Sequence, residues 1–66
     1  MMNQDVLQNA DRKLQQVMMN AETCRDHLRD MRFKHLTQSE RDQSRQFYRD
    51  ALQALRNAVD EVAPPF

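Results

Sequence analysis

Cysteine and histidine are the residues of this chain best suited to chemistry, and three of them lie near one another in the sequence. Cys24 and His27 are three residues apart, and His35 follows them. On a helix this i, i+3 spacing would put Cys24 and His27 on one face. Such a pair suits a metal ion, or a thiolate nucleophile activated by a neighbouring imidazole.

The rest of the chain does not supply the partners that either chemistry needs. A structural zinc site takes four ligands, and the sequence has one Cys and two His. A catalytic nucleophile needs an oxyanion hole and a group that orients its histidine, but glycine-rich loops are absent because the chain has no glycine. We therefore expect no metal, no other cofactor and no enzymatic activity, and we expect Cys24 to be a small buried apolar residue.

Length and composition favour one small helical domain. The 66 residues form one domain at most, over 1–66, in a size range where a lone core gives little stability. Pro64 and Pro65 are the only prolines, so nearly the whole chain lacks a strong helix breaker. We expect an all-α fold.

Features of export or membrane insertion do not appear in the sequence. No apolar run approaches the length of about 18 residues that a membrane helix needs. The first residues, M-M-N-Q-D-V, lack the basic and apolar blocks of a signal peptide. A single cysteine agrees with a reducing compartment. We expect a cytoplasmic protein that does not bind membranes.

The first half of the chain carries an unbroken heptad pattern. Apolar or small residues recur with gaps that alternate between three and four, at Leu7, Ala10, Leu14, Val17, Ala21, Cys24, Leu28 and Met31. This pattern is typical of one continuous helix with a narrow packing seam. We expect this helix over about residues 3–33.

A capping box predicts the start of a second helix. Thr37 is followed three residues later by Glu40, and each can bond the other's backbone N–H. The seam then resumes at Ser44, Tyr48, Ala51, Leu55, Ala58 and Val62. We expect a turn over 34–37, a helix over about 38–62 and a non-helical tail over 63–66, since a residue before proline leaves the helical region. Without glycine, we expect a residue near Lys34 or His35 to adopt a left-handed or otherwise irregular conformation.

One long helix is the alternative to a hairpin. The first seam, continued in steps of four and three, would meet His35, Gln38, Asp42 and Arg45, none of which is apolar. The seam therefore breaks where the cap lies. This favours two antiparallel helices, because short connections join antiparallel neighbours.

The second helix has an apolar face too wide for one neighbouring helix to cover. Large residues also alternate with small ones along both seams, as in the cores of four-helix bundles. We therefore expect two hairpins to pair into a four-helix bundle. The predicted dimer seam consists of Leu7, Leu14, Val17, Leu28, Met31, Phe47, Tyr48, Leu52, Leu55, Val59 and Val62.

The two heptad helices, the short central turn and the layering of large against small residues resemble the plasmid-encoded RNA-binding hairpins of the Rop type, which are antiparallel four-helix dimers. The outline is also similar to small phage-encoded hairpins that bind and disable host regulators, including anti-quorum-sensing proteins. The resemblance covers nearly the whole chain and is architectural, without a motif specific to either group. It implies a regulator that binds either RNA or a host protein.

Charge is divided between the two ends of the expected hairpin. Residues 25–49 hold seven basic and four acidic residues, a net charge of +3. Residues 1–24 hold two basic and three acidic residues (−1), and residues 50–66 hold one and three (−2). Many of these charges can form solvated local pairs. The division can also guide antiparallel pairing of two hairpins, or serve an acidic partner.

Arginines and off-seam apolar residues are the candidates for a partner-binding surface. Arginine and aromatic residues are enriched at interface hot spots, and methionine adapts to varied surfaces. Val6 and Phe66 also lie outside the first seam. We expect a protein partner, such as a host regulator or enzyme that the chain inhibits. The predicted partner-binding residues are Arg25, Arg29, Arg32, Phe33, Arg41, Arg45, Arg49, Met18 and Met19.

Two other functions stay open. The resemblance to the Rop-type hairpins implies that RNA would bind the outer face of the first helix. This face is rich in amides and poorly basic, with Asn9, Arg12, Gln15, Gln16, Glu22 and Asp26. Phosphate neutralisation supplies most non-specific affinity for nucleic acid, so RNA ranks second. A structural or assembly adaptor ranks third.

Overall fold

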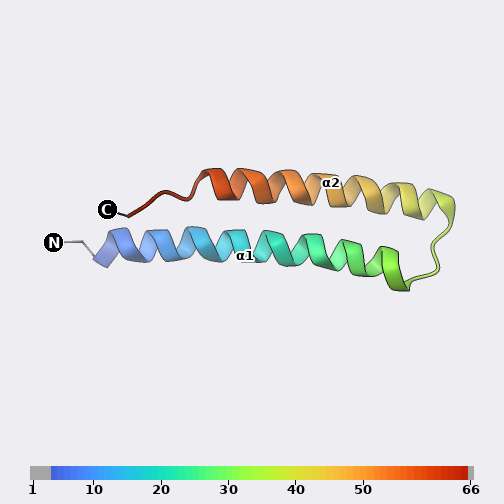
Figure 1. Ribbon diagram of the computed structural model, residues 1–66, viewed down its shortest axis with the longest axis horizontal. Coiled ribbons are helices and arrows are strands. Elements are labelled where there is room, and N and C mark those ends of the chain that lie inside the picture. The colour runs from blue at the N-terminus through green and yellow to red at the C-terminus, as the bar shows by residue number, and fades with distance from the viewer. Residues whose placement is uncertain (1–3, 66) are drawn as a thin grey trace.

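The computed structural model describes residues 4–65, which form two long helices. Helix α1 spans Gln4–Phe33 and helix α2 spans Gln38–Asp60. The two helices pack side by side and run in opposite directions, so both ends of the chain lie at the same end of the molecule (Figure 1). The prediction of an all-α helical hairpin is confirmed.

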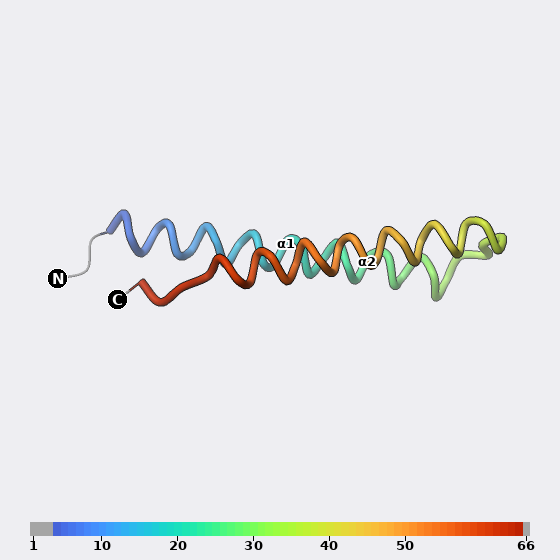
Figure 2. Tube along the Cα trace, turned by 90° about the horizontal axis from the view of Figure 1, so that it is seen from above, coloured from blue at the N-terminus to red at the C-terminus, as the bar shows by residue number. Residues whose placement is uncertain are grey.

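The hairpin is a single layer of two helices. Its Cα atoms extend 56 Å along the helices and only 11 Å in the thinnest direction. Viewed from above, the two helices cross at a shallow angle (Figure 2). A single layer has two broad faces, so each helix is covered by protein on one side only.

The predicted capping box starts helix α2. The N–H of Glu40 donates to Thr37 Oγ1 at 3.2 Å, and the N–H of Thr37 donates to Glu40 Oε1 at 3.1 Å. The hydrogen bond with the backbone of Thr37 is the largest cause that lowers the pKa of Glu40, and the hydrogen bond with the Thr37 side chain is the second. Both favour the carboxylate form. The prediction of a helix start at Thr37 is confirmed.

The turn between the helices contains no left-handed residue. No residue within 4–65 has a positive φ, so the left-handed alternative predicted near Lys34 or His35 does not occur, and residues 34–37 are irregular instead. The N–H of Lys34 still donates to the carbonyl of Asp30 at 3.0 Å, which extends the hydrogen bonds of α1 by one residue. The chain then reverses before Thr37 through residues with negative φ, because the connection is long enough to need no tighter turn.

Helix α2 ends at Asp60, two residues before the predicted end at Val62. Glu61 is the C-cap, and its N–H donates to the carbonyls of Asn57 and Ala58, each at 3.3 Å. The N–H of Val62 donates to Val59 at 3.0 Å, so the helix closes with a tighter turn ahead of the prolines. Residues 63–65 are non-helical, while residue 3 and Phe66 lie outside the described residues.

The contact between the helices is thin. Cys24, near the middle of α1, is 6% exposed and is the one buried residue in the described part of the chain. The prediction that it is a small buried apolar residue is confirmed. The predicted seam of the second helix is half-buried. It consists of Ser44, Tyr48, Ala51, Leu55 and Ala58 in α2 and of Val62 just beyond its end.

The predicted seam of α1 divides into two rows with different environments. We call Ala10, Val17, Cys24 and Met31 the inner row, and Leu7, Leu14, Ala21 and Leu28 the leucine row. The inner row is half-buried or buried. The three leucines of the leucine row are exposed, and Leu14 is 49% exposed. Helix α2 therefore covers the inner row and leaves the leucine row largely open.

One ring contact shows which flank of α2 lies beside the leucine row. The ring centroids of His27 and Phe47 are 5.8 Å apart. His27 lies on the flank of the inner row opposite the leucine row, so Phe47 marks that side of α2 as well. Leu52 and Val59 lie on the other flank of α2 and therefore on the side of the leucine row. We call this broad surface, formed by the leucine row with Leu52 and Val59, the leucine face.

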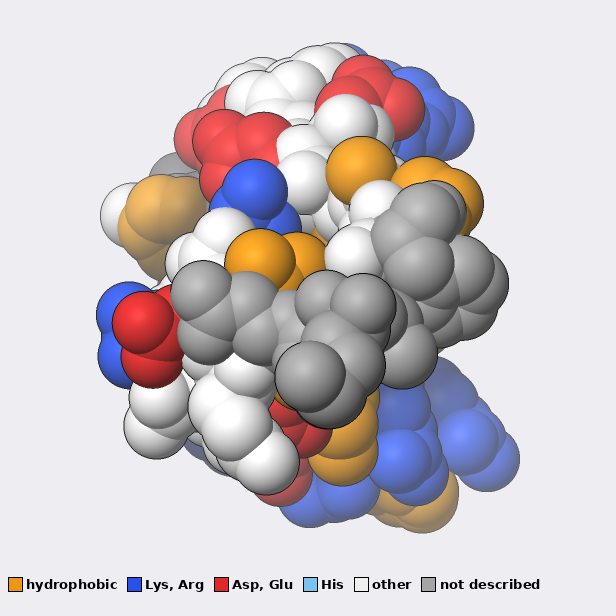
Figure 3. Space-filling view, turned by 90° about the vertical axis from the view of Figure 1, so that its left-hand side faces the viewer, with side chains coloured by type: hydrophobic (Ala, Val, Ile, Leu, Met, Phe, Trp, Pro, Cys, Tyr) orange, Lys and Arg blue, Asp and Glu red, His pale blue; other side chains and the backbone are white. Residues whose placement is uncertain are grey.

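Apolar side chains of the hairpin are not enclosed. Figure 3, which looks at the terminal end, shows hydrophobic side chains at the surface beside basic ones. Val59, on the leucine face, is 50% exposed. Within residues 4–65, neither helix is both long enough and apolar enough to cross a membrane.

Candidate partner-binding surface

Three arginines and two apolar residues gather at the turn end of α1. They line a hollow of about 220 Å³, and we call it the arginine hollow; its residues are Arg25, Leu28, Arg29, Arg32 and Phe33. Their spacing brings them together over the last turns of the helix, because residues three and four apart are neighbours on its surface. The arginine hollow thus unites the four residues of the first helix that were predicted at its basic end.

The arginine hollow presents an aromatic ring to solvent. Phe33 is 70% exposed, and the guanidinium carbon of Arg32 lies 4.8 Å from the centroid of its ring. This is a cation–π contact, in which the positive charge is attracted to the face of the ring. An exposed phenylalanine beside an arginine can anchor a partner after losing its water.

Only one of the three arginines forms a local ion pair within residues 4–65. Arg29 Nη1 lies 3.8 Å from Asp26 Oδ1, in an exposed pair that contributes at most about 1 kcal/mol. Among the residues that the structure describes, Arg25 and Arg32 have no ion pair. Their guanidinium groups can each bind a carboxylate through two parallel hydrogen bonds.

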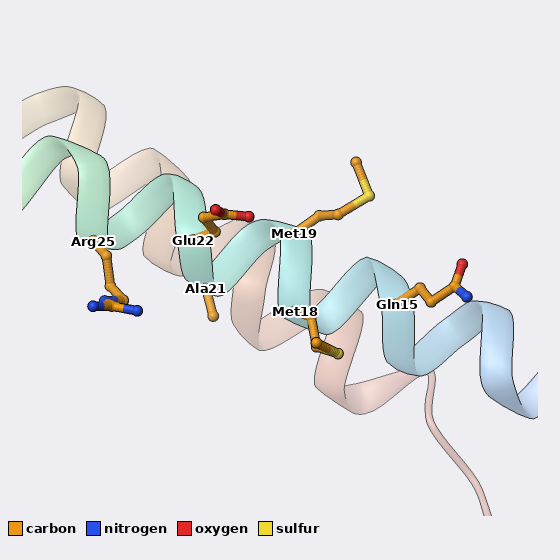
Figure 4. Close-up of a pocket in the computed structure, with 6 residues that line it drawn as sticks. All are labelled: Gln15, Met18, Met19, Ala21, Glu22 and Arg25. Atoms are coloured by element: carbon orange, nitrogen blue, oxygen red, sulfur yellow. The ribbon is translucent and has the colours of Figure 1, made fainter.

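A second, larger hollow adjoins the first along α1. It measures about 600 Å³, and its residues all come from α1: Gln15, Met18, Met19, Ala21, Glu22 and Arg25 (Figure 4). Arg25 lines both hollows. In Figure 4, Met18, Ala21 and Arg25 project to one side of the helix and Met19 projects to the other. Met18 therefore lies on the side of the leucine face, next to the leucine row.

The three predicted arginines of α2 are also exposed. Arg45 Nη1 lies 3.8 Å from Asp42 Oδ1, again in an exposed local pair. Arg45 is seven residues before Leu52, so it continues the same row and lies at the turn end of the leucine face. Arg41 and Arg49 lie beside it on the exposed surface. Arginines from both helices thus border the leucine face at its turn end.

Cys24 and His27 lie in different surroundings. Cys24 is buried between the helices, while His27 is half-buried and packs against Phe47. His35 is exposed in the turn. In the described part of the chain, no group of three or more His, Cys, Asp or Glu residues is placed to hold a metal ion.

The structure divides the predicted dimer seam into two sets. The members that are half-buried within one hairpin are Val17, Met31, Tyr48, Leu52, Leu55 and Val62. The exposed members are Leu7, Leu14, Leu28, Phe47 and Val59. Leu28 also lines the arginine hollow, a position that the sequence pattern did not reveal because a seam assigns all its members to the core.

Comparison of the chain with protein-family models, with curated proteins and with solved structures finds no match. What the structure has in common with the Rop-type and phage-encoded hairpins is an all-α fold of two packed helices. The function is therefore inferred from the surfaces of the hairpin itself.

Proposed function

We propose that this chain is a non-enzymatic interaction protein that acts as a homodimer and binds an acidic surface of another protein. The partner is a regulator or an enzyme, and binding inhibits it by covering that surface. The observation that carries the proposal is the arginine hollow, where Arg32 has no ion pair among the described residues and Phe33 is largely exposed.

The chemistry of the arginine hollow supports an acidic protein partner. Planar guanidinium groups recognise carboxylates in a fixed geometry, and the exposed ring of Phe33 adds apolar area that a partner can bury. The surrounding segment, residues 25–49, has a net charge of +3 in a chain whose total is zero. This local excess steers an acidic surface towards the turn end.

The exposed area of the hairpin supports a homodimer. A compact monomer of 7.9 kDa is expected to expose about 4,400 Å². The hairpin exposes 5665 Å², which is roughly 1,250 Å² more than that scaling gives. A standard protein interface buries about 800 Å² on each partner. The excess is therefore large enough for a second copy on one face with surface remaining for another partner.

RNA binding is the second candidate function, because three arginines in one hollow also suit phosphate groups. Two observations rank it lower. The net charge of the chain is zero, and Asp26 and Asp30 lie between the arginines of α1. An assembly adaptor would use the same surfaces without inhibiting its partner.

Affinity capture with a matched variant tests the proposed function. The wild type is immobilised beside a variant that carries Arg32→Glu and Arg45→Glu, and a second variant with Gln16→Glu controls for added charge. Lysate of the source cells is treated with nuclease, and each captured protein is purified and titrated by calorimetry. We expect a protein that binds the wild type and the control and loses at least about a hundredfold in affinity, or 2.7 kcal/mol, for the reversed variant.

Two results contradict the proposal. A captured protein that binds the reversed variant as tightly as the wild type removes the arginines from the site. Nucleic acid that copurifies without nuclease, absorbs at 260 nm and dissociates as salt rises favours RNA binding instead.

A further inference from the structure

We infer that the leucine face binds a second copy of the chain in antiparallel orientation, with Met18 at the two-fold axis and Asp11 of each copy beside Arg25 of the other. The inference deepens the proposed homodimer and rests on it. It specifies the surface, the orientation and the register of the two copies.

The leucine row is complementary to itself when it is reversed. In an antiparallel pair of α1 helices, residues lie opposite each other when their numbers add to the same total. The alignment that opposes Leu7 to Leu28 of the second copy therefore also opposes Leu14 to Ala21. The two leucines exposed near the centre of the face, one from each copy, then each meet an alanine. Large residues against small ones fill such a layer at close-packed density.

The neighbouring row of α1 supports the same register. Gln4, Asp11, Met18, Arg25 and Arg32 are seven residues apart and border the leucine row on its outer side. In the alignment given above, this row brings Asp11 beside Arg25 of the second copy and Met18 beside Met18, each with an offset of one residue from direct opposition. Figure 4 agrees with the row, since Met18 and Arg25 project to the same side of the helix.

Charge decides between the two possible orientations. Stacking two turn ends would bring Arg25, Arg32 and Arg45 of one copy against the same arginines of the other, and like charges in an interface are costly. The antiparallel orientation instead places each basic turn end, of net charge +3, beside the acidic terminal end of the second copy, where residues 1–24 and 50–66 carry −1 and −2. Two pairs between Asp11 and Arg25 then lie symmetrically about the axis.

This arrangement accounts for the exposure of two side chains that a lone hairpin leaves in water. Met18 is 70% exposed and Leu14 is 49% exposed. Both become buried at the centre of the proposed interface. Arg25 is occupied by the second copy, so Arg29 and Arg32 remain for the acidic partner at the edge of the dimer.

Disulfide trapping tests the inference, using Met18→Cys and, as a matched control, Met19→Cys. Met19 is adjacent in sequence, 60% exposed and projects to the opposite side of the helix. We expect Met18→Cys to form an intermolecular disulfide under mild oxidation, because the two sulfurs meet at the axis within disulfide reach. Met19→Cys and the wild type, whose Cys24 is buried, should stay unlinked. Equal trapping of both variants, or no trapping of Met18→Cys, overturns the register.

Charge reversal provides a second test that does not depend on cysteine chemistry. Asp11→Arg and Arg25→Asp should each weaken the dimer about tenfold or more in Kd, and the two changes combined should restore it, because the pair is reformed with reversed sign. Arg12→Asp, on the other side of α1, is the control. A double variant no tighter than the singles contradicts the pairing. Binding of the acidic partner, measured by calorimetry, is a separate readout. If no dimer is trapped while the partner still binds, the proposed orientation is wrong and the proposed function stands.

Discussion

The inner row and the leucine row of helix α1 have the same period and similar apolar content, yet only one of them is covered. Cys24 of the inner row is 6% exposed, whereas Leu14 of the leucine row is 49% exposed. The difference arises because α2 supplies one helix surface, and a heptad seam in a bundle faces two neighbours. A heptad seam therefore predicts which side chains face a neighbouring helix. It does not say whether that helix belongs to the same chain or to another one.

The polar flank of α1 strengthens this contrast. Lys13, Asn20 and His27 are half-buried by α2, while the leucines on the opposite flank are exposed. A lone hairpin would therefore cover polar residues in preference to leucines. The proposed second copy on the leucine face would correct this imbalance, because apolar burial stabilises by about 25 cal/mol for each Å² removed from water.

The largest expected effect comes from Leu55→Asp. Leu55 is half-buried on the seam of α2 that faces α1, so the change places a charge without a partner inside the hairpin itself. We expect loss of most helical signal in circular dichroism and loss of the dimer. Gln53→Asp, at an exposed position of the same helix, should remain folded. A helical Leu55→Asp chain would show that the hairpin does not depend on this seam.

A second pair of variants compares the two rows directly. Leu14→Ala should cost roughly 2–5 kcal/mol if a second copy covers the side chain, and no more than about 0.5 kcal/mol if it stays in water. Val17→Ala, from the inner row, should destabilise the protein in either case. Denaturant unfolding at two protein concentrations measures both. A negligible effect of Leu14→Ala would mean that the leucine row has no neighbour.

Thr37→Ala should have a smaller effect that leaves both rows unchanged. The change removes the hydroxyl that accepts from the N–H of Glu40 at 3.2 Å, and the loss of an N-cap typically costs about 1 kcal/mol. We expect a lower melting temperature with an unchanged mass in solution. An unchanged melting temperature would show that the cap contributes nothing to the stability of α2.

The smallest expected effect is a pH dependence of the cap. The pKa of Glu40 is lowered in the folded chain, so its contribution to stability is fully present above its unfolded pKa and is lost as pH falls through the folded value. Melting temperatures should fall over this acidic range more for the wild type than for Glu40→Gln, which cannot titrate at this position. Parallel curves for the two proteins would argue against the cap as the cause.

Local features of this fold could be predicted from the sequence, whereas the choice between flanks could not. The capping box depends on Thr37 and Glu40 alone, so four consecutive residues were enough to place the start of α2. Which flank of α1 faces α2 depends on contacts such as that between His27 and Phe47, which are distant in sequence. The sequence also left open whether the turn near Lys34 and His35 is left-handed or otherwise irregular, and the structure has an irregular turn without positive φ.

The arginine hollow was predicted only in part for a similar reason. Arg25, Arg29, Arg32 and Phe33 belong to one helix, and their spacing already placed them near one another. The role of Leu28 depends on the leucine row being open, and the sequence pattern assigned that row to the interior. The arginines of α2 border the same face only because of the side on which the two helices meet.

The mass of the wild-type chain in solution tests the central claim most directly. Sedimentation equilibrium over a range of concentrations should give twice the chain mass of 7.9 kDa, with circular dichroism showing a helical protein throughout. A second copy on the leucine face requires this result. A stable helical species of 7.9 kDa at every concentration would contradict the claim, because the leucine row would then be exposed in the folded state.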